Sequence, residues 1–184
     1  MAVRLETGGL PQSRALRSYP GSPNDAYGMR REHFTLDVSN VDWVETDGEP
    51  RKPSVSIDFT GPETMLRERL TGPDGEPLDA SETDVSLRLT EPLEDDAAGV
   101  VSVTDRLTGD FVLELNESAE NVLTFIRAAR TYGESTSDDE GRYDVSISID
   151  GEPFVTYDKQ TFLVYDDQGD LLRGHSLIPS GVEL

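Results

Sequence analysis

The sequence contains no cysteine, and Lys52 and Lys159 are the only lysines among its 184 residues. The absence of cysteine excludes disulfide frameworks, thiolate zinc sites, iron–sulfur clusters and cysteine nucleophiles. No apolar run approaches the roughly eighteen residues of a membrane-spanning helix, and no segment resembles a secretory signal. We therefore expect a cytoplasmic protein with no membrane partner.

Positive charge is scarce throughout the chain. Sixteen Lys and Arg face 37 Asp and Glu, and the formal net charge is −21. Such an excess destabilises the folded state in dilute buffer, whereas at 1 M salt the Debye length of roughly 3 Å screens the repulsion. Lysine scarcity fits the same environment, because salt drives the long apolar lysine stem toward self-association. We interpret the composition as adaptation to the salt-rich cytoplasm of a haloarchaeon; the alternatives are a mesophilic acidic protein, an acidic disordered tail and a nucleic-acid mimic.

Residues 1–28 differ in composition from the rest of the chain. They carry three arginines against Glu6 and Asp25, a net charge of +1, which leaves −22 for the remainder of a chain with a total of −21. The segment lacks hydrophobic periodicity and is rich in glycine and proline, which predicts disorder. We expect Met29 to be the true initiator and residues 1–28 to be a disordered leader outside the native protein. The alternative is a short basic arm that grips an acidic partner.

From Met29 onward, apolar residues alternate with polar ones, which is the pattern of half-buried β-strands. Asp-Gly or Gly-containing turns join several of the strands into antiparallel hairpins. The first strand is expected to resume at Val41 and Trp43 after a bulge at Ser39-Asn40. The apolar positions that predict strands are Phe34-Leu36-Val38, Val55-Ile57-Phe59, Val85-Leu87-Leu89, Val101-Val103, Phe111-Leu113-Leu115, Val145-Ile147-Ile149, Phe154-Val155, Phe162-Leu163-Val164 and Leu171-Leu172.

One helix is predicted from Ala119 to Tyr132. Ser118 or Asn116 can cap its first amides, and Gly133 follows as a left-handed stop. An apolar stripe at helical spacing predicts that the helix packs on the sheet. A shorter helical turn is expected around Met65-Leu66 and Leu70. The sequence therefore predicts a single α+β domain over residues 29–184: a mostly antiparallel β-sheet, sandwich-like or barrel-like, of about eight or nine strands with one main packed helix.

A search for chemical motifs is negative. The sequence has no phosphate-binding loop, no dinucleotide fingerprint, no nucleophile elbow and no HExxH, so no catalytic residue, metal site or cofactor is predicted. The Asp166–Asp170 segment lacks the glycine and the glutamate that a calcium loop requires at its sixth and twelfth positions. Nucleic acid is not an expected partner, since no basic stripe is present.

Two arginines and a histidine form the candidate anion or partner site. Arg127 and Arg130 lie beside the apolar stripe of the predicted helix, and His175 stands near Arg173 close to the C-terminus. The two arginines could clamp an anion or a carboxylate, or they could extend apolar stems along the core and complement the helix dipole. No partner for a proton relay through His175 can be named from the sequence.

The C-terminal tail from Ser176 to Leu184 is the second candidate site. It places Leu177, Ile178, Val182 and Leu184 at the end of an otherwise acidic chain. Such a tail could dock on a partner protein or add a strand to it. The alternative is that the tail packs on its own sheet.

Several stretches resemble one uncharacterised protein family of haloarchaea, from about Met29 to the C-terminus. They are Arg30–Val38 with Val41-Asp42-Trp43, Leu70–Pro73, Thr161–Asp166 and the closing His175–Leu184. The resemblance implies a haloarchaeal origin and a single domain. It transfers no activity and no functional residue.

Two classes of function remain, together with a minor third. We expect a non-catalytic interaction or accessory module with an unknown protein partner. The alternative is a small-molecule-binding or enzymatic domain that uses the arginines and His175, and a concave pocket with converging polar groups there would favour it. The third possibility is an acidic decoy for a basic protein surface. The sequence does not define the oligomeric state.

Overall fold

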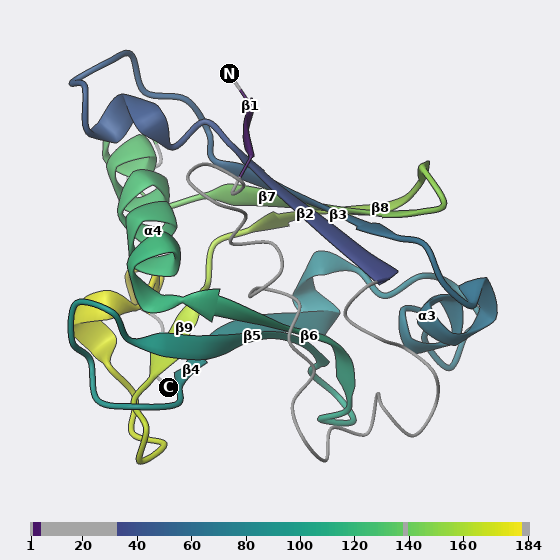
Figure 1. Cartoon of the computed structure of the whole chain (residues 1–184). Coiled ribbons are helices and arrows are strands. Elements are labelled where there is room, and N and C mark those ends of the chain that lie inside the picture. The colour runs from purple at the N-terminus through teal and green to yellow at the C-terminus, as the bar shows by residue number, and fades with distance from the viewer. Residues whose placement is uncertain (1, 5–32, 138–139, 182–184) are drawn as a thin grey trace.

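The computed structural model describes residues 2–4, 33–137 and 140–181 (Figure 1). In these residues the chain forms an α+β fold. The strands are β1 (Ala2–Arg4), β2 (Phe34–Ser39), β3 (Ser54–Phe59), β4 (Thr83–Leu89), β5 (Ala98–Asp105), β6 (Phe111–Ser118), β7 (Tyr143–Ile149), β8 (Glu152–Lys159) and β9 (Leu163–Tyr165). The helices are α3 (Glu63–Arg69) and α4 (Ala119–Glu134), with short 3₁₀ turns η2 (Asp42–Val44), η3 (Ala80–Glu82) and η4 (Arg173–His175).

The eight strands β2–β9 divide into two mixed, mostly antiparallel four-stranded sheets. One sheet has the order β2-β3-β7-β8, with the short β1 added beside β2, and the other has the order β6-β5-β4-β9. Neighbouring strands are antiparallel except at β3–β7 and β4–β9, which are parallel. The predicted fold class is therefore confirmed, and the two parallel pairs are the feature that hairpin signals do not predict.

The sheets form two layers, and α4 stands across one end of them (Figure 1). It connects the end of β6 to the loop that precedes β7, whereas α3 lies at the other end. Alternation explains the layers, and it is clearest in β7, where the inner residues Tyr143, Val145, Ile147 and Ile149 are buried and the residues between them are half-buried. Both inner faces and the apolar face of α4 contribute to one hydrophobic core.

The first strand is shorter than predicted. The expected continuation of the strand through Val41 and Trp43 is wrong, because Asn40 adopts a left-handed conformation with φ of 62°. The chain then turns into η2, and the buried Trp43 indole nitrogen donates to the backbone oxygen of Asn40 at 2.6 Å. A short asparagine tolerates that backbone, so the apparent bulge is a reversal of direction.

The main helix is longer than predicted. It continues through Gly133 to Glu134, so the expectation that Gly133 is a left-handed stop is wrong. A Cβ atom on Gly133 would lie 2.2 Å from the backbone carbon and oxygen of Glu140. Glycine is therefore needed there for close approach of the following loop rather than for helix termination. The predicted cap is confirmed, because the Ser118 hydroxyl accepts from the Asn121 amide.

The N-terminal segment is described only in part. Ala2–Arg4 forms β1 and pairs antiparallel with β2. Residues 5–28 lie outside the described residues, so the disordered leader stays a prediction for them. The helical turn expected around Met65 is confirmed as α3.

Candidate functional site

The fold brings the three predicted basic residues together. Arg127 and Arg130 on α4 and His175 in η4 line one surface hollow of about 650 Å³. Arg127 and His175 are exposed, whereas Arg130 is half-buried and its Nη2 donates to the Ser176 backbone oxygen at 2.8 Å. Arg130 therefore ties the C-terminal segment to α4.

The surroundings of this hollow are acidic. Four carboxylates share its lining with the basic residues, namely Glu45, Glu94, Asp95 and Glu120. They balance the positive charge of the arginines and oppose the approach of an anion. The geometry thus gathers the predicted residues without giving them the electropositive field that an anion clamp requires.

The predicted docking tail is anchored in the core at its beginning. Leu177 is only 4% exposed and exchanges backbone hydrogen bonds with Phe162 at 2.8 and 2.9 Å. The Ser176 hydroxyl accepts from the Val164 amide and donates to the Leu172 oxygen. Leu177 is therefore unavailable to a partner and Ile178 is half-buried, whereas Val182 and Leu184 lie outside the described residues.

A second, more enclosed cavity lies between the two sheets. Its volume is about 300 Å³, and inner-face residues from both sheets and from α4 line it. Much of its wall is buried and apolar, including Leu36 and Ile57 from one sheet, Leu113 and Leu115 from the other, and Phe125 from α4. The aromatic rings of Phe125, Tyr143 and Phe162 form part of the wall, with centroids 5.3 to 6.4 Å apart.

The mouth of this cavity is acidic. Among the lining residues Asp42, Glu45 and Glu120 are exposed, so they stand where the cavity meets solvent. Glu45, Glu120 and Thr124 line both this cavity and the hollow with the arginines, so the two depressions share a rim. The molecule therefore has an apolar interior space with a negatively charged entrance.

One carboxyl group lies inside the apolar wall. Glu117 lines the cavity and is 9% exposed, at the inward-facing position of β6 that follows Leu113 and Leu115. Its Oε1 accepts from the Ser118 amide at 2.8 Å and from the Asn121 side-chain nitrogen at 2.9 Å. Its Oε2 is buried and has no hydrogen-bond partner among the described residues.

The electrostatics of Glu117 have opposing contributions. Burial raises the pKa of its carboxyl group above the ordinary value, and the hydrogen bonds from Asn121 and Ser118 offset only part of that shift. The first amides of α4 also favour a negative charge at this place. A buried oxygen without a hydrogen-bond donor costs free energy. Oε2 is therefore an acceptor for which the described residues provide no donor.

Comparison with known proteins places the chain in a family. Residues 29–184 match the model described as "Family of unknown function (DUF5793)". The chain belongs to this family. No curated protein and no solved structure matches the chain. The matched range agrees with the extent of the resemblance noted in the sequence, and the family description assigns no activity.

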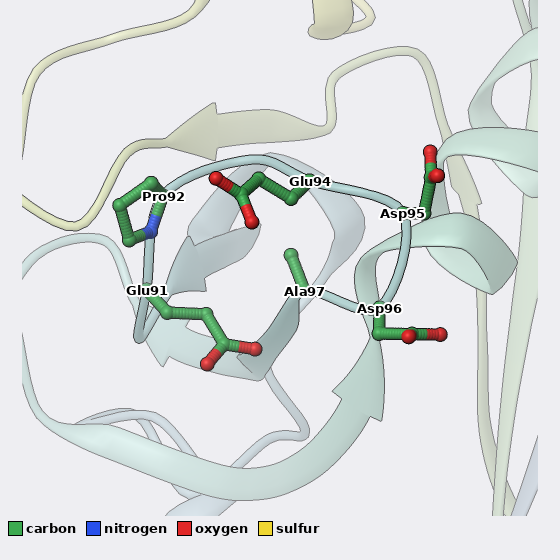
Figure 2. A pocket seen from close by; sticks show the side chains of 6 residues that line it. All are labelled: Glu91, Pro92, Glu94, Asp95, Asp96 and Ala97. Atoms are coloured by element: carbon green, nitrogen blue, oxygen red, sulfur yellow. The ribbon is translucent and has the colours of Figure 1, made fainter.

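An acidic loop of this DUF5793 member carries carboxylates but does not form a cation site among the described residues. Residues 91–97 surround an open hollow lined by Glu91, Glu94, Asp95 and Asp96, and their carboxylates are spread around the loop without converging (Figure 2). Glu91 accepts from the Ala98 amide instead. Within residues 2–4, 33–137 and 140–181, no three His, Cys, Asp or Glu side chains are grouped to hold a metal ion. In the same residues no helix has the length and apolar character needed to cross a membrane.

The motif search missed Glu117 although a signal was present. The alternation of Leu113 and Leu115 on β6 extends in phase to Glu117, which places a carboxylate on the buried face. Glu117 stands between Asn116 and Ser118, the two residues predicted to cap the helix, and no role was predicted for it. A charged residue in phase with an apolar strand face is the pattern that would have identified it.

Proposed function

We propose that this DUF5793 member is a non-catalytic small-molecule-binding protein whose ligand occupies the cavity between the two sheets. The observation that carries the proposal is the apolar cavity of about 300 Å³ that opens beside α4 and contains a polar atom, Glu117 Oε2, without a partner in the part of the chain that the structure describes. Ligand sites are typically apolar spaces of this size or larger with a few placed polar groups. The sequence analysis gave a small-molecule-binding domain as the alternative function. The binding site proposed here is the cavity between the sheets instead of the surface near the arginines.

The neutral apolar dye Nile red tests the proposal. We expect saturable binding with increased fluorescence, because the cavity wall offers an apolar environment. Val101→Phe on β5 should abolish binding by filling the cavity, since Val101 lines it. Val100→Phe is the matched control, because Val100 is the half-buried neighbour on the same strand and does not line the cavity.

The variant must remain folded for the test to be informative. Thermal unfolding of both valine variants supplies that check, and Val55→Phe fills the same cavity from the opposite sheet. Absence of saturable binding in the folded wild type would overturn the proposal. Equal binding by folded Val101→Phe and Val100→Phe would also overturn it, since the dye would then bind elsewhere.

The interaction module expected from the sequence remains a second proposal. Support comes from the β5–β6 hairpin, where Leu107 is 73% and Phe111 is 43% exposed. Strand β6 is the edge of its sheet, and an edge strand can accept a strand from a partner. A partner bound by the wild type should be lost with Leu107→Ser/Phe111→Ser and retained with Leu93→Ser, which removes an exposed leucine from another loop.

A further inference from the structure

We infer that the ligand of the cavity is an amine with an apolar body, and that its ammonium group pairs with the Glu117 carboxylate. The inference rests on the proposed function and specifies the ligand class. The apolar wall accommodates the body, and Glu117 supplies the one buried charged group among the described lining residues.

The hydrogen bonds of the Glu117 carboxyl group show that the ligand must supply a hydrogen-bond donor. Oε1 is held by two donors, which fixes the orientation of the carboxyl group. Oε2 therefore needs a donor from outside. No polar group of the described residues donates to Oε2, since the Asn121 side-chain nitrogen reaches Oε1 instead and the Tyr143 hydroxyl donates to the Thr161 oxygen. An N–H group of a ligand would complete the site.

Charge selects among possible donors. An ammonium group gains both a hydrogen bond and an ion pair with Glu117, and a charge-assisted hydrogen bond is roughly twice as strong as a neutral one. The exposed Asp42, Glu45 and Glu120 at the mouth attract a cation in the same way. A carboxylate ligand such as a fatty acid would meet only like charges along this route. Arg127 and Arg130 line the adjacent hollow and not the cavity.

The size of the cavity limits the ligand. A volume of about 300 Å³ corresponds to roughly ten water molecules in the liquid, which suits a body of about eight carbon atoms. A linear or branched aliphatic amine of this size fits, as does a phenylalkylamine that stacks on Phe125 or Phe162.

Octylamine, 1-octanol and octanoate test the inference, because they share a chain length and differ in the head group. Their affinities for the full-length protein are measured at pH 7 by calorimetry and by displacement of Nile red. We expect octylamine to bind about tenfold or more tightly than 1-octanol, since a hydrogen bond to a charged group is worth that much. Octanoate should bind more weakly than 1-octanol.

The variant Glu117→Gln tests whether the Glu117 carboxylate causes the preference for octylamine over 1-octanol. The substitution keeps the shape of the side chain and removes its charge, so the advantage of octylamine over 1-octanol should disappear while 1-octanol still binds. Glu152→Gln is the control, because Glu152 is exposed in the β7–β8 hairpin at the end of the molecule away from α4 (Figure 1). It removes the same charge and should leave the preference intact.

The outcomes separate this inference from the proposed function. Equal binding of the three octyl compounds, or a preference for octylamine that survives Glu117→Gln in a folded variant, would overturn the amine assignment and leave the cavity as a ligand site. A failure of Nile red and of all three compounds to bind the folded wild type would overturn both proposals.

Discussion

Both lysines of the chain act as internal connections. The Lys52 Nζ lies 2.6 Å from Asp144 Oδ1 and 3.1 Å from Asp158 Oδ1, so it joins the start of β3 to β7 and β8. Lys159 is only 7% exposed, and its Nζ donates to the backbone oxygens of Ala80 and Thr83 at 2.6 and 2.5 Å. Burial lowers the pKa of the Lys159 ammonium group. The rare lysines of this sequence thus serve the fold rather than the solvent-exposed surface.

Two buried tyrosines form a natural pair for a stability measurement. The Tyr143 hydroxyl donates to the Thr161 oxygen at 2.6 Å, whereas the Tyr157 hydroxyl has no partner among the described residues. Tyr143→Phe should lower the free energy of unfolding by about 1 kcal/mol, because a hydrogen bond is lost and an acceptor is left unpaired. Tyr157→Phe should be neutral or stabilising. Urea unfolding at pH 7 measures both, and an equal loss in the two variants would mean that Tyr157 has a bound partner in solution.

The buried carboxyl group of Glu117 predicts a pH dependence of stability. Because its pKa is raised in the folded protein by burial, the folded state binds more protons than the unfolded state above the ordinary value of 4.5. Its contribution is therefore fully present below pH 4.5 and is lost as pH rises through the folded pKa. Glu117→Gln removes the titration, so the stability of the variant relative to wild type should be higher at pH 7 than at pH 4.5. Urea unfolding at both pH values measures this difference, and a relative stability unchanged between them would show that the group is not shifted.

At the scale of elements, the connection from α4 to β7 depends on close backbone approach. Gly133 is buried, and any added Cβ would overlap the Glu140 backbone and lie 2.4 Å from the Gly141 amide nitrogen. Gly133→Ala should therefore destabilise the protein by about 1–3 kcal/mol, as overpacking in a core does. This outweighs the gain of up to about 1 kcal/mol that alanine brings to an open helix position. Denaturant unfolding of Gly133→Ala against Gly174→Ala, where no atom lies within 4 Å, checks the expectation.

The elements also show which features a sequence can predict. Alternation located eight of the nine predicted strands, whereas the strand expected at Leu171-Leu172 is wrong, because Leu171 forms only an isolated bridge to Tyr165. The Asp150-Gly151 turn identified a hairpin, since both residues have the positive φ that such a turn requires. Trp43 was misassigned, because one left-handed residue, Asn40, changes the chain direction without altering the apolar spacing. The parallel pairs of β3 with β7 and of β4 with β9 follow from packing of segments far apart in the chain.

The candidate site was predictable only in part. Arg127 and Arg130 were predicted from their position beside the apolar stripe of the helix and His175 from its place near Arg173, and the fold does bring the three together. The cavity was not predictable, because empty space between two sheets depends on how side chains from both layers fit. Glu117 continues the alternation of β6, but no role was predicted for it, since the expected cap residues were Ser118 or Asn116.

At the scale of the whole molecule, the net charge of −21 is the dominant property. We predict that stability rises with potassium chloride, because salt screens repulsion over distances longer than the Debye length, about 10 Å at 0.1 M and about 3 Å at 1 M. A gain of about 2 kcal/mol would raise the melting temperature by roughly 4–8 °C for a chain of this size. Thermal unfolding between 0.1 and 2 M potassium chloride measures the effect.

A variant of the acidic loop serves as a control for the salt prediction. Glu94→Gln/Asp95→Asn/Asp96→Asn removes three exposed negative charges from residues 91–97 and leaves the Glu91 contact to Ala98 in place (Figure 2). The melting temperature of this variant should depend less steeply on salt than that of the wild type. A wild type that is equally stable in dilute buffer would show that its surplus of carboxylates serves a purpose other than tolerance of salt.

The parallel pairing of β3 with β7 has a consequence for synthesis on the ribosome. Asp58 of β3 accepts a hydrogen bond from Ser148 of β7, 90 residues later in the chain. Strand β3 is therefore synthesised long before β7. Until the intervening residues have been translated, the edge of β3 that pairs with β7 stays unpaired. Since unpaired edges are where nascent chains aggregate, the rate of elongation through residues 60–142 sets how long this edge is exposed to other chains.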